Sequence, residues 1–229
     1  MKTIGLIGGM SWESTVTYYQ ILNEVVKEQL GGFHSAKILL YSVDFAEIEE
    51  HQTTGQWDKS AEVLGNAAQT LEKAGADLIL ICTNTMHKVA PQVCSRISVP
   101  LVHIAEVTAD ALAEAGITTV GLLGSKYTMT QDFYKQKLID RGINVLIPDE
   151  AGMEIVNHVI FNELCLGQIR EESRQQYVAI IEDLRRRGAQ GVILGCTEIG
   201  LLVRQEDTSL PVFDTTVIHG RKAAQLALD

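Results

Sequence analysis

Short apolar runs alternate with longer segments of helical period along nearly the whole chain. The runs are continuous, a pattern typical of strands that are covered on both faces in a parallel sheet. They predict strands at residues 3–8, 36–43, 77–82, 100–104, 119–124, 143–147, 190–195 and 211–213. The periodic segments predict helices at residues 14–30, 59–74, 105–115, 130–141, 154–165 and 171–187. This alternation indicates a doubly wound α/β fold.

Glycines mark the ends of three predicted helices. Gly75, Gly116 and Gly188 each follow such a segment, where a left-handed C-terminal cap favours a residue without a side chain. We therefore expect these three helices to end there.

The chain contains an internal repeat. Residues 3–10 resemble 119–126, residues 75–83 resemble 188–196, and residues 99–102 resemble 210–213. Three matches in the same order and at nearly constant offset indicate a duplicated half. We therefore expect two similar α/β lobes, one formed by residues 1–104 with 210–229 and the other by residues 105–209.

Duplication predicts where a ligand binds. Open α/β sheets bind ligands beyond the carboxyl ends of their strands. Two lobes related by a pseudo-twofold axis would direct those ends toward one shared cleft. The repeat aligns Thr83 with Cys196 and Asn84 with Thr197. One reactive side chain is thus expected on each side of a bound molecule.

Composition excludes several classes of protein. The 229 residues carry a net charge of −10, which argues against a protein that coats nucleic-acid phosphates. The apolar runs are too short to cross a membrane, and the first residues lack a signal-peptide pattern, so a cytoplasmic protein is expected. The four cysteines are too dispersed for a disulfide framework. Without a CxxC, HExxH or G-x-G-x-x-G pattern, we expect no metal site and no dinucleotide.

Cys196 lies in the segment Gly195-Cys196-Thr197-Glu198, directly after a predicted buried strand. If a helix follows, its N-terminal dipole favours the thiolate and lowers the thiol pKa toward that of a usable base. The alternative is that Cys196 is a small core residue, a common use of cysteine. Its strand-end position favours the functional interpretation.

Thr83 holds the matching position in the segment Cys82-Thr83-Asn84-Thr85. A hydroxyl is a weak base and threonine is a common helix cap, so capping is the alternative role. Cys82 competes for the chemistry, but strand alternation turns it to the other side and the repeat aligns Thr83 with Cys196. His87 is a candidate capping or orienting group, while the remaining histidines, His219 among them, are interpreted as ordinary polar residues.

The motifs Gly8-Gly9-Met10-Ser11, Thr83-Asn84-Thr85 and Gly195-Cys196-Thr197-Glu198 together resemble the aspartate/glutamate racemase family. The resemblance spans essentially the whole chain. It implies two pseudosymmetric flavodoxin-like lobes with parallel sheets, an active site in the cleft between the lobes, no cofactor, and a homodimer. The usual family pattern has a cysteine where Thr83 stands. That departure resembles the branch described as L-aspartate/glutamate-specific racemases, in which a Thr/Cys pair replaces Cys/Cys.

The resemblance also implies a role for each site residue. Thr83 and Cys196 would act as acid and base on opposite faces of the α-carbon of aspartate or glutamate, with the L-enantiomer preferred. The implied substrate-binding residues are Met10, Gln52, Asn84, Thr85, Ser125, Thr128, Thr197 and Glu198. Lys126, between Ser125 and Thr128, is either an anion ligand or a solvated side chain.

Two alternatives stay open. Hydantoin racemase, maleate isomerase and arylmalonate decarboxylase share such lobes, so the first alternative is another small acid as substrate. In the second alternative, the threonine at position 83 marks a catalytically silent protein that binds a dicarboxylate or an amino acid. Exchange of the α-proton with solvent deuterium separates turnover from binding alone.

Overall fold

The computed structural model describes residues 1–229, which form two compact units. Unit 1 comprises Met1–Ile104 and His219–Asp229, and unit 2 comprises Ala105–Ile218. Residues 210–218 therefore belong to unit 2 rather than to the first lobe as expected. The reason is that strand β7 (Val212–Asp214) pairs in parallel with β6 (Val192–Gly195).

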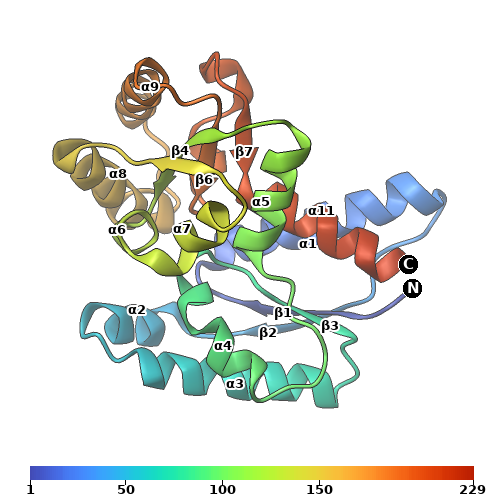
Figure 1. Cartoon of the computed structure of the whole chain (residues 1–229). Coiled ribbons are helices and arrows are strands. Elements are labelled where there is room, and N and C mark those ends of the chain that lie inside the picture. The colour runs from blue at the N-terminus through green and yellow to red at the C-terminus, as the bar shows by residue number, and fades with distance from the viewer. The chain divides into compact units, whose positions relative to one another are not determined.

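Unit 1 contains a three-stranded parallel sheet. Strand β1 (Ile4–Gly8) lies between β2 (Ile38–Ser42) and β3 (Leu78–Ile81). Helix α1 (Trp12–Leu30) and the unit 1 part of α11 (Thr215–Leu228) lie on one face of this sheet, and the other face carries α2 (Phe45–Thr53), α3 (Trp57–Lys73) and α4 (Ala90–Cys94) (Figure 1). The predicted α/β layering is thus confirmed in this unit.

The core of unit 1 explains why its strands read as continuous apolar runs. Every residue of β1 and β3 is buried. Ile7 and Ile79 pack in one cluster with Leu64 and Leu71 of α3, and burying a side chain of this size stabilises the fold by roughly 1.5–3 kcal/mol. Both faces of these strands are covered, so neither shows an apolar–polar alternation.

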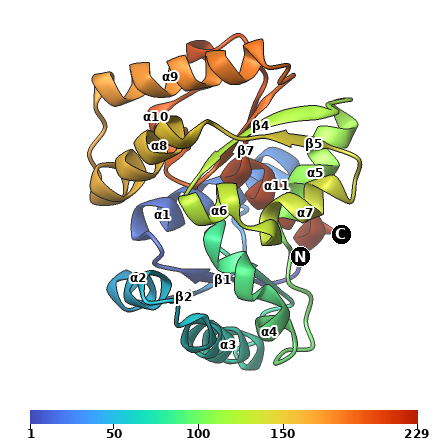
Figure 2. The same cartoon turned by 60° about the vertical axis from the view of Figure 1, so that its left-hand side comes forward.

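Unit 2 contains a four-stranded parallel sheet in the order β5-β4-β6-β7. Strand β4 (Thr119–Gly124) is flanked by β5 (Asn144–Leu146) and β6. The helices are α5 (Ile104–Glu114), α6 (Lys126–Thr130), α7 (Asp132–Ile139), α8 (Glu150–Asn162), α9 (Glu171–Arg186) and α10 (Ile199–Leu202). Figure 2 shows α8 and α9 together on one side of the sheet, where Val156 and Ile181 pack against Leu123 and Val192.

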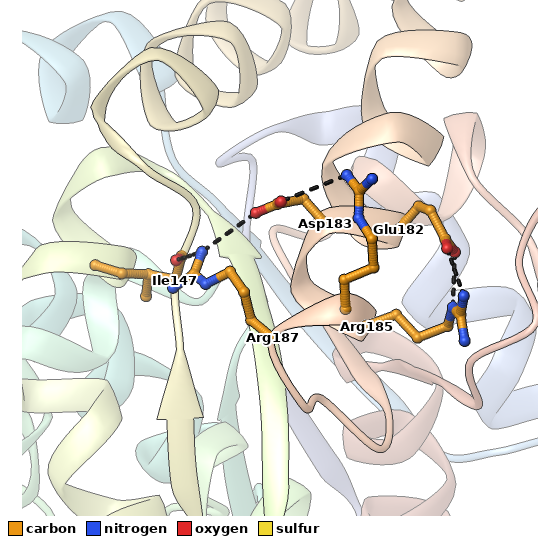
Figure 3. A network of polar contacts seen from close by, with 6 residues as sticks. Ile147, Glu182, Asp183, Arg185 and Arg187 are labelled. Atoms are coloured by element: carbon orange, nitrogen blue, oxygen red, sulfur yellow. Dashed lines mark hydrogen bonds and ion pairs between the residues drawn. The ribbon is translucent and has the colours of Figure 1, made fainter.

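Charged side chains at the end of α9 hold the loop after β5 (Figure 3). The Arg187 guanidinium donates to the Ile147 carbonyl at 3.0 Å and lies 3.5 Å from the Asp183 carboxylate. Arg185 donates to both carboxylate oxygens of Glu182, at 2.8 and 2.6 Å, and this pairing lowers the pKa of the Glu182 carboxyl. The Arg187 contact ties the loop that leads into α8 to the end of α9.

The strand pairing supports the internal repeat. The order β2-β1-β3 in unit 1 matches β5-β4-β6 in unit 2. Gly5 pairs with Ile79 in unit 1, and Gly121 pairs with Val192 in unit 2, which are the pairs that the sequence alignment makes equivalent. Thr83 and Cys196 therefore hold the same position in their respective halves.

Two expected elements differ in the structure. The strand expected at residues 100–104 is a single bridge between Ile79 and Leu101, because the Ile104 N–H donates to a histidine ring and α5 begins there. The helix expected at residues 130–141 is the shorter α7, because Gln131 has extended backbone angles, and the unpredicted helix α6 precedes Gln131. Helices α2 and α11 were not predicted.

The glycine caps are confirmed. Gly75, Gly116 and Gly188 have φ angles of 99°, 71° and 103°, a region that side chains disfavour. Each therefore ends its helix as the sequence indicates. None of the helices combines the length and the apolar content needed to cross a bilayer.

Candidate active site

Thr83 and Cys196 each follow a fully buried strand, β3 in unit 1 and β6 in unit 2. Both residues are half-buried. Because they belong to different units, each is described here with the neighbours in its own unit.

Thr83 is held by contacts of its backbone. The Thr83 carbonyl accepts a hydrogen bond from Nδ1 of His87 at 2.8 Å. Asn84 and Thr85, which follow it, are buried. Cys82 is fully buried, and this burial raises the pKa of its thiol. Cys82 is thus poorly suited to proton transfer, and Thr83 is the more accessible of the two.

Met10 and Gln52 lie beside the Thr83 motif in unit 1. The Gln52 amide nitrogen donates to the Met86 sulfur at 3.1 Å, and Met10 packs in the same buried cluster as Met86. Gly9, before Met10, has a φ of 91°, and a Cβ there would lie 2.3 Å from the Val43 carbonyl oxygen. Only glycine fits this turn, which sets the direction of Met10.

Cys196 donates a hydrogen bond from its thiol to Oε2 of Glu198 at 2.9 Å. The Thr197 hydroxyl donates to the same oxygen, also at 2.9 Å, and both Thr197 and Glu198 are buried. A carboxylate in this position accepts hydrogen bonds from both side chains and repels a substrate carboxylate. Glu198 thus holds the Cys196 and Thr197 side chains through one carboxylate oxygen.

The expected thiolate at Cys196 is a wrong prediction. Burial, with the nearby Glu198 carboxylate, raises the pKa of the Cys196 thiol well above its ordinary value. Helix α10, which begins three residues later, has only four residues, and so short a helix supplies little dipole. The raised pKa favours the protonated thiol, which donates its hydrogen bond to Glu198.

Ser125 and Thr128 lie at the strand end next to Cys196 within unit 2. Gly124 pairs with Gly195, and a Cβ on Gly195 would lie 2.8 Å from the Leu123 carbonyl oxygen, so the two strands require glycine at this end. Ser125 caps α6 by accepting from the Thr128 N–H at 3.3 Å. Ser125 and Cys196 are therefore the first residues beyond paired strand ends.

Lys126 is an exposed ion-pair partner of Glu154 on α8. Its backbone N–H donates to the Asn157 side chain at 2.8 Å. The Lys126 side chain is thus exposed to solvent, as in the second of the two roles left open for it, and its ammonium group is paired within the protein.

Two residues of unit 1 behind Thr83 were missed by sequence reasoning. The Tyr18 hydroxyl lies 2.7 Å from Nδ1 of His219, and Nε2 of His219 donates to the Val102 carbonyl at 2.8 Å. Burial lowers the pKa of His219 to about 3. The His87 ring lies with its centroid 5.7 Å from that of His219. Because the sequence pattern predicts no helix at α11, it gives no indication of the neighbours of His219.

Other features of unit 2 lie away from these residues. A cavity of about 470 Å³ between α8 and α9 is lined by Glu163, Arg170 and Ser173 among others, and none of its lining residues is a predicted site residue. No group of three or more His, Cys, Asp or Glu side chains is arranged to hold a metal ion.

Known proteins resemble this chain over its whole length. The model of the Asp/Glu/hydantoin racemase family matches residues 7–223. A solved structure from Yersinia pestis, described provisionally as an Asp/Glu racemase, is 54% identical, covers 100% of both chains and has a TM-score of 0.93. An aspartate racemase homologue from Pyrococcus horikoshii is 38% identical, with 100% of both chains covered and a TM-score of 0.87.

A curated relative resembles the chain at lower identity. The broad specificity amino-acid racemase RacX of Bacillus subtilis is 22% identical over 93% of this chain and 92% of its own length. The family match and the two full-length structural relatives lead to one conclusion: the chain belongs to the Asp/Glu/hydantoin racemase family, whose members are isomerases.

Proposed function

We propose that the chain is a cofactor-independent racemase of aspartate or glutamate that acts by two-base proton transfer at Cα and prefers the L-enantiomer. The observation that carries the proposal is the Cys196 thiol hydrogen-bonded to Glu198 at 2.9 Å, at the position that the repeat makes equivalent to Thr83. A thiol with a built-in proton acceptor is an activated acid–base group.

The proposed reaction begins at Cys196. Glu198 takes the thiol proton, and the thiolate then removes the α-proton from one face of the substrate. The electron pair of the broken C–H bond moves into the α-carboxylate, which becomes an enediolate. A proton delivered to the opposite face of Cα by the Thr83 hydroxyl, directly or through a water, completes the inversion. Glu198 then releases the thiol proton to solvent, and Thr83 or that water takes up a proton from solvent.

Neutral donors bind the carboxylates in this proposal. Asn84, Thr85 and Thr197, with nearby backbone N–H groups, hold the α-carboxylate and stabilise the charge that develops on it. Gln52, Ser125 and Thr128 lie toward the distal carboxylate, and Met10 lines the pocket. Glu198 serves Cys196 instead of the substrate.

The names of the relatives support this substrate class to different degrees. The Pyrococcus horikoshii protein is an aspartate racemase homologue, which favours an acidic amino acid. The Bacillus subtilis relative has broad specificity, and the family name includes hydantoin, so another small acid is the second candidate. The resemblance to this family also supports a homodimer, which sedimentation velocity tests, and a cytoplasmic location.

A chiral panel tests the proposal. The purified chain is incubated with single L- and D-amino acids without pyridoxal phosphate, and the products are separated on a chiral column. We expect inversion of aspartate or glutamate, loss of inversion in Cys196→Ala and Thr83→Val, and retention in Cys94→Ser, which alters an exposed cysteine. Binding of aspartate without inversion or α-proton exchange would contradict the proposal and indicate a silent binding protein.

A further inference from the structure

The imidazole of His87 connects the Thr83 motif to the start of α5 within unit 1. Its Nδ1 lies 2.8 Å from the Thr83 carbonyl oxygen, and its Nε2 lies 3.2 Å from the Ile104 backbone nitrogen, which donates to it. His87 is 1% exposed. A side chain buried between two backbone segments holds both in a fixed arrangement.

These two contacts define the tautomer of His87. A carbonyl oxygen only accepts, so Nδ1 carries the proton, and a backbone N–H only donates, so Nε2 is the acceptor. The ring is therefore neutral. Burial and the neighbouring His103, whose centroid lies 4.6 Å away, lower the pKa of His87 well below its ordinary value, which keeps this tautomer at neutral pH.

The hydrogen bond to Thr83 sets the orientation of the following peptide. The only cis peptide bond in the chain is Met10–Ser11, so the Thr83–Asn84 peptide is trans and planar. In a trans peptide the C=O and the N–H point in opposite directions. Because the Thr83 carbonyl points at His87, the Asn84 N–H points away from His87, and the plane that carries both residues is fixed.

We propose that His87 is a positioning residue, whose Nδ1–H group fixes the Thr83–Asn84 peptide so that the Thr83 hydroxyl and the Asn84 N–H are presented to the amino-acid substrate. The proposal rests on the racemase function proposed above. It assigns His87 no contact with the substrate.

The second half of the repeat has no histidine at the position equivalent to His87. Gly200 occupies the position equivalent to His87, and a Cβ there would lie 2.2 Å from Oδ2 of Asp214, so the Asp214 carboxylate fills part of the space. Cys196 is instead oriented through its own side chain by Glu198. The half with the weaker acid–base group, the hydroxyl, is thus the half whose backbone is held by a buried histidine.

Two amide substitutions separate the contacts of His87. His87→Asn places an amide N–H near the position of Nδ1 and keeps the donor to Thr83. His87→Gln carries its amide toward the position of Nε2, so it keeps an acceptor for Ile104 and loses the donor to Thr83. Both variants are checked for wild-type thermal unfolding before activity is measured.

The test measures two rates in deuterated water with aspartate and glutamate. One is inversion, which needs both faces of the substrate, and the other is α-deuterium uptake with retention, which needs only the Cys196 face. For His87→Gln we expect inversion to fall at least tenfold with retention exchange within about threefold of wild type, and for His87→Asn we expect both rates within about threefold. Equal losses of both rates, or full inversion by His87→Gln, would overturn the proposal.

A spectroscopic measurement keeps the outcome independent of turnover. Long-range ¹H–¹⁵N NMR of the free chain should show His87 neutral and protonated on Nδ1, with that pattern lost in His87→Gln. An Nε2-protonated ring would overturn the positioning role even in an active enzyme. If the wild-type chain neither inverts nor exchanges the substrate but shows the expected His87 signals, the proposed function is wrong.

Discussion

The Cys196 thiol donates to Oε2 of Glu198 at 2.9 Å, two residues further along the chain. The two side chains form an acid–base pair within one short segment. Burial and this carboxylate both raise the pKa of the thiol, so the carboxylate that can receive the proton also keeps the thiol protonated until it is needed.

Glu198→Gln should therefore have opposite effects on thiol reactivity and on catalysis. Removing the negative charge lowers the pKa of the Cys196 thiol, so alkylation by iodoacetamide should become faster at a fixed mildly alkaline pH. Racemisation should fall by about 10²–10⁴-fold because the proton acceptor is lost. The measurement is the pH dependence of alkylation in a Cys94→Ser background, which removes an exposed competing thiol; slower alkylation in Glu198→Gln would contradict the pairing.

The turn at Gly9 gives a prediction about stability. Gly9 and Gly75 both have positive φ angles, 91° and 99°. A Cβ on Gly9 would lie 2.3 Å from the Val43 carbonyl oxygen, whereas nothing lies within 4 Å of one on Gly75. Gly75→Ala should cost about 1–2 kcal/mol for the unfavourable backbone angle, and Gly9→Ala about 1–3 kcal/mol more for the clash. Urea unfolding measures both, and equal costs would show that the turn at Gly9 relaxes freely.

Buried His219 makes the stability of the fold depend on pH. Its pKa is about 3 in the folded chain and about 6.5 when unfolded. Between these values the unfolded chain binds more protons, so stability rises with pH in this window and is lost on acidification. From pH 7 to pH 5 this one histidine should remove about 2 kcal/mol of unfolding free energy. His219→Gln should show a correspondingly smaller loss in urea titrations at the two pH values; identical losses would contradict the assignment.

The two proposed acid–base groups, Thr83 and Cys196, differ in chemistry, and the reaction rates should differ with them. A thiol and a hydroxyl are separated by several pKa units, so proton removal from the two faces of Cα proceeds at unequal rates. Initial rates from L- and D-aspartate, followed by polarimetry, should therefore be clearly unequal, while the final mixture stays racemic because an enzyme leaves the equilibrium unchanged. Near-equal rates from both enantiomers would contradict a Thr/Cys pair.

Much of the fold could be predicted because four of its strands are buried almost throughout. The continuous apolar runs identified β1, β3, β4 and β6, and the repeat identified the equivalence of Thr83 and Cys196, which the matching strand registers support. Strand β7 was assigned to the wrong lobe. The repeat predicts that this strand exists, but it does not indicate that the strand pairs with β6.

The properties of the site residues were harder to predict. The pKa of Cys196 depends on burial and on the direction of the Glu198 side chain, and neither can be read from the order of residues. The short helix α10 could not be distinguished from one long enough to favour a thiolate. The contact of Tyr18 with His219 joins residues far apart in the chain, so no local pattern indicates it.

Exchange of the α-proton in deuterated water, followed by ¹H NMR for L- and D-aspartate, tests the central claim most directly. Cys196→Ala should abolish exchange, Thr83→Val should keep retention exchange of one enantiomer without inversion, and Cys82→Ala should behave as wild type, because Cys82 is buried and its thiol stays protonated. An inert Cys82→Ala variant beside an active Cys196→Ala variant would contradict the assignment of Thr83 and Cys196 as the two groups that serve opposite faces of one α-carbon.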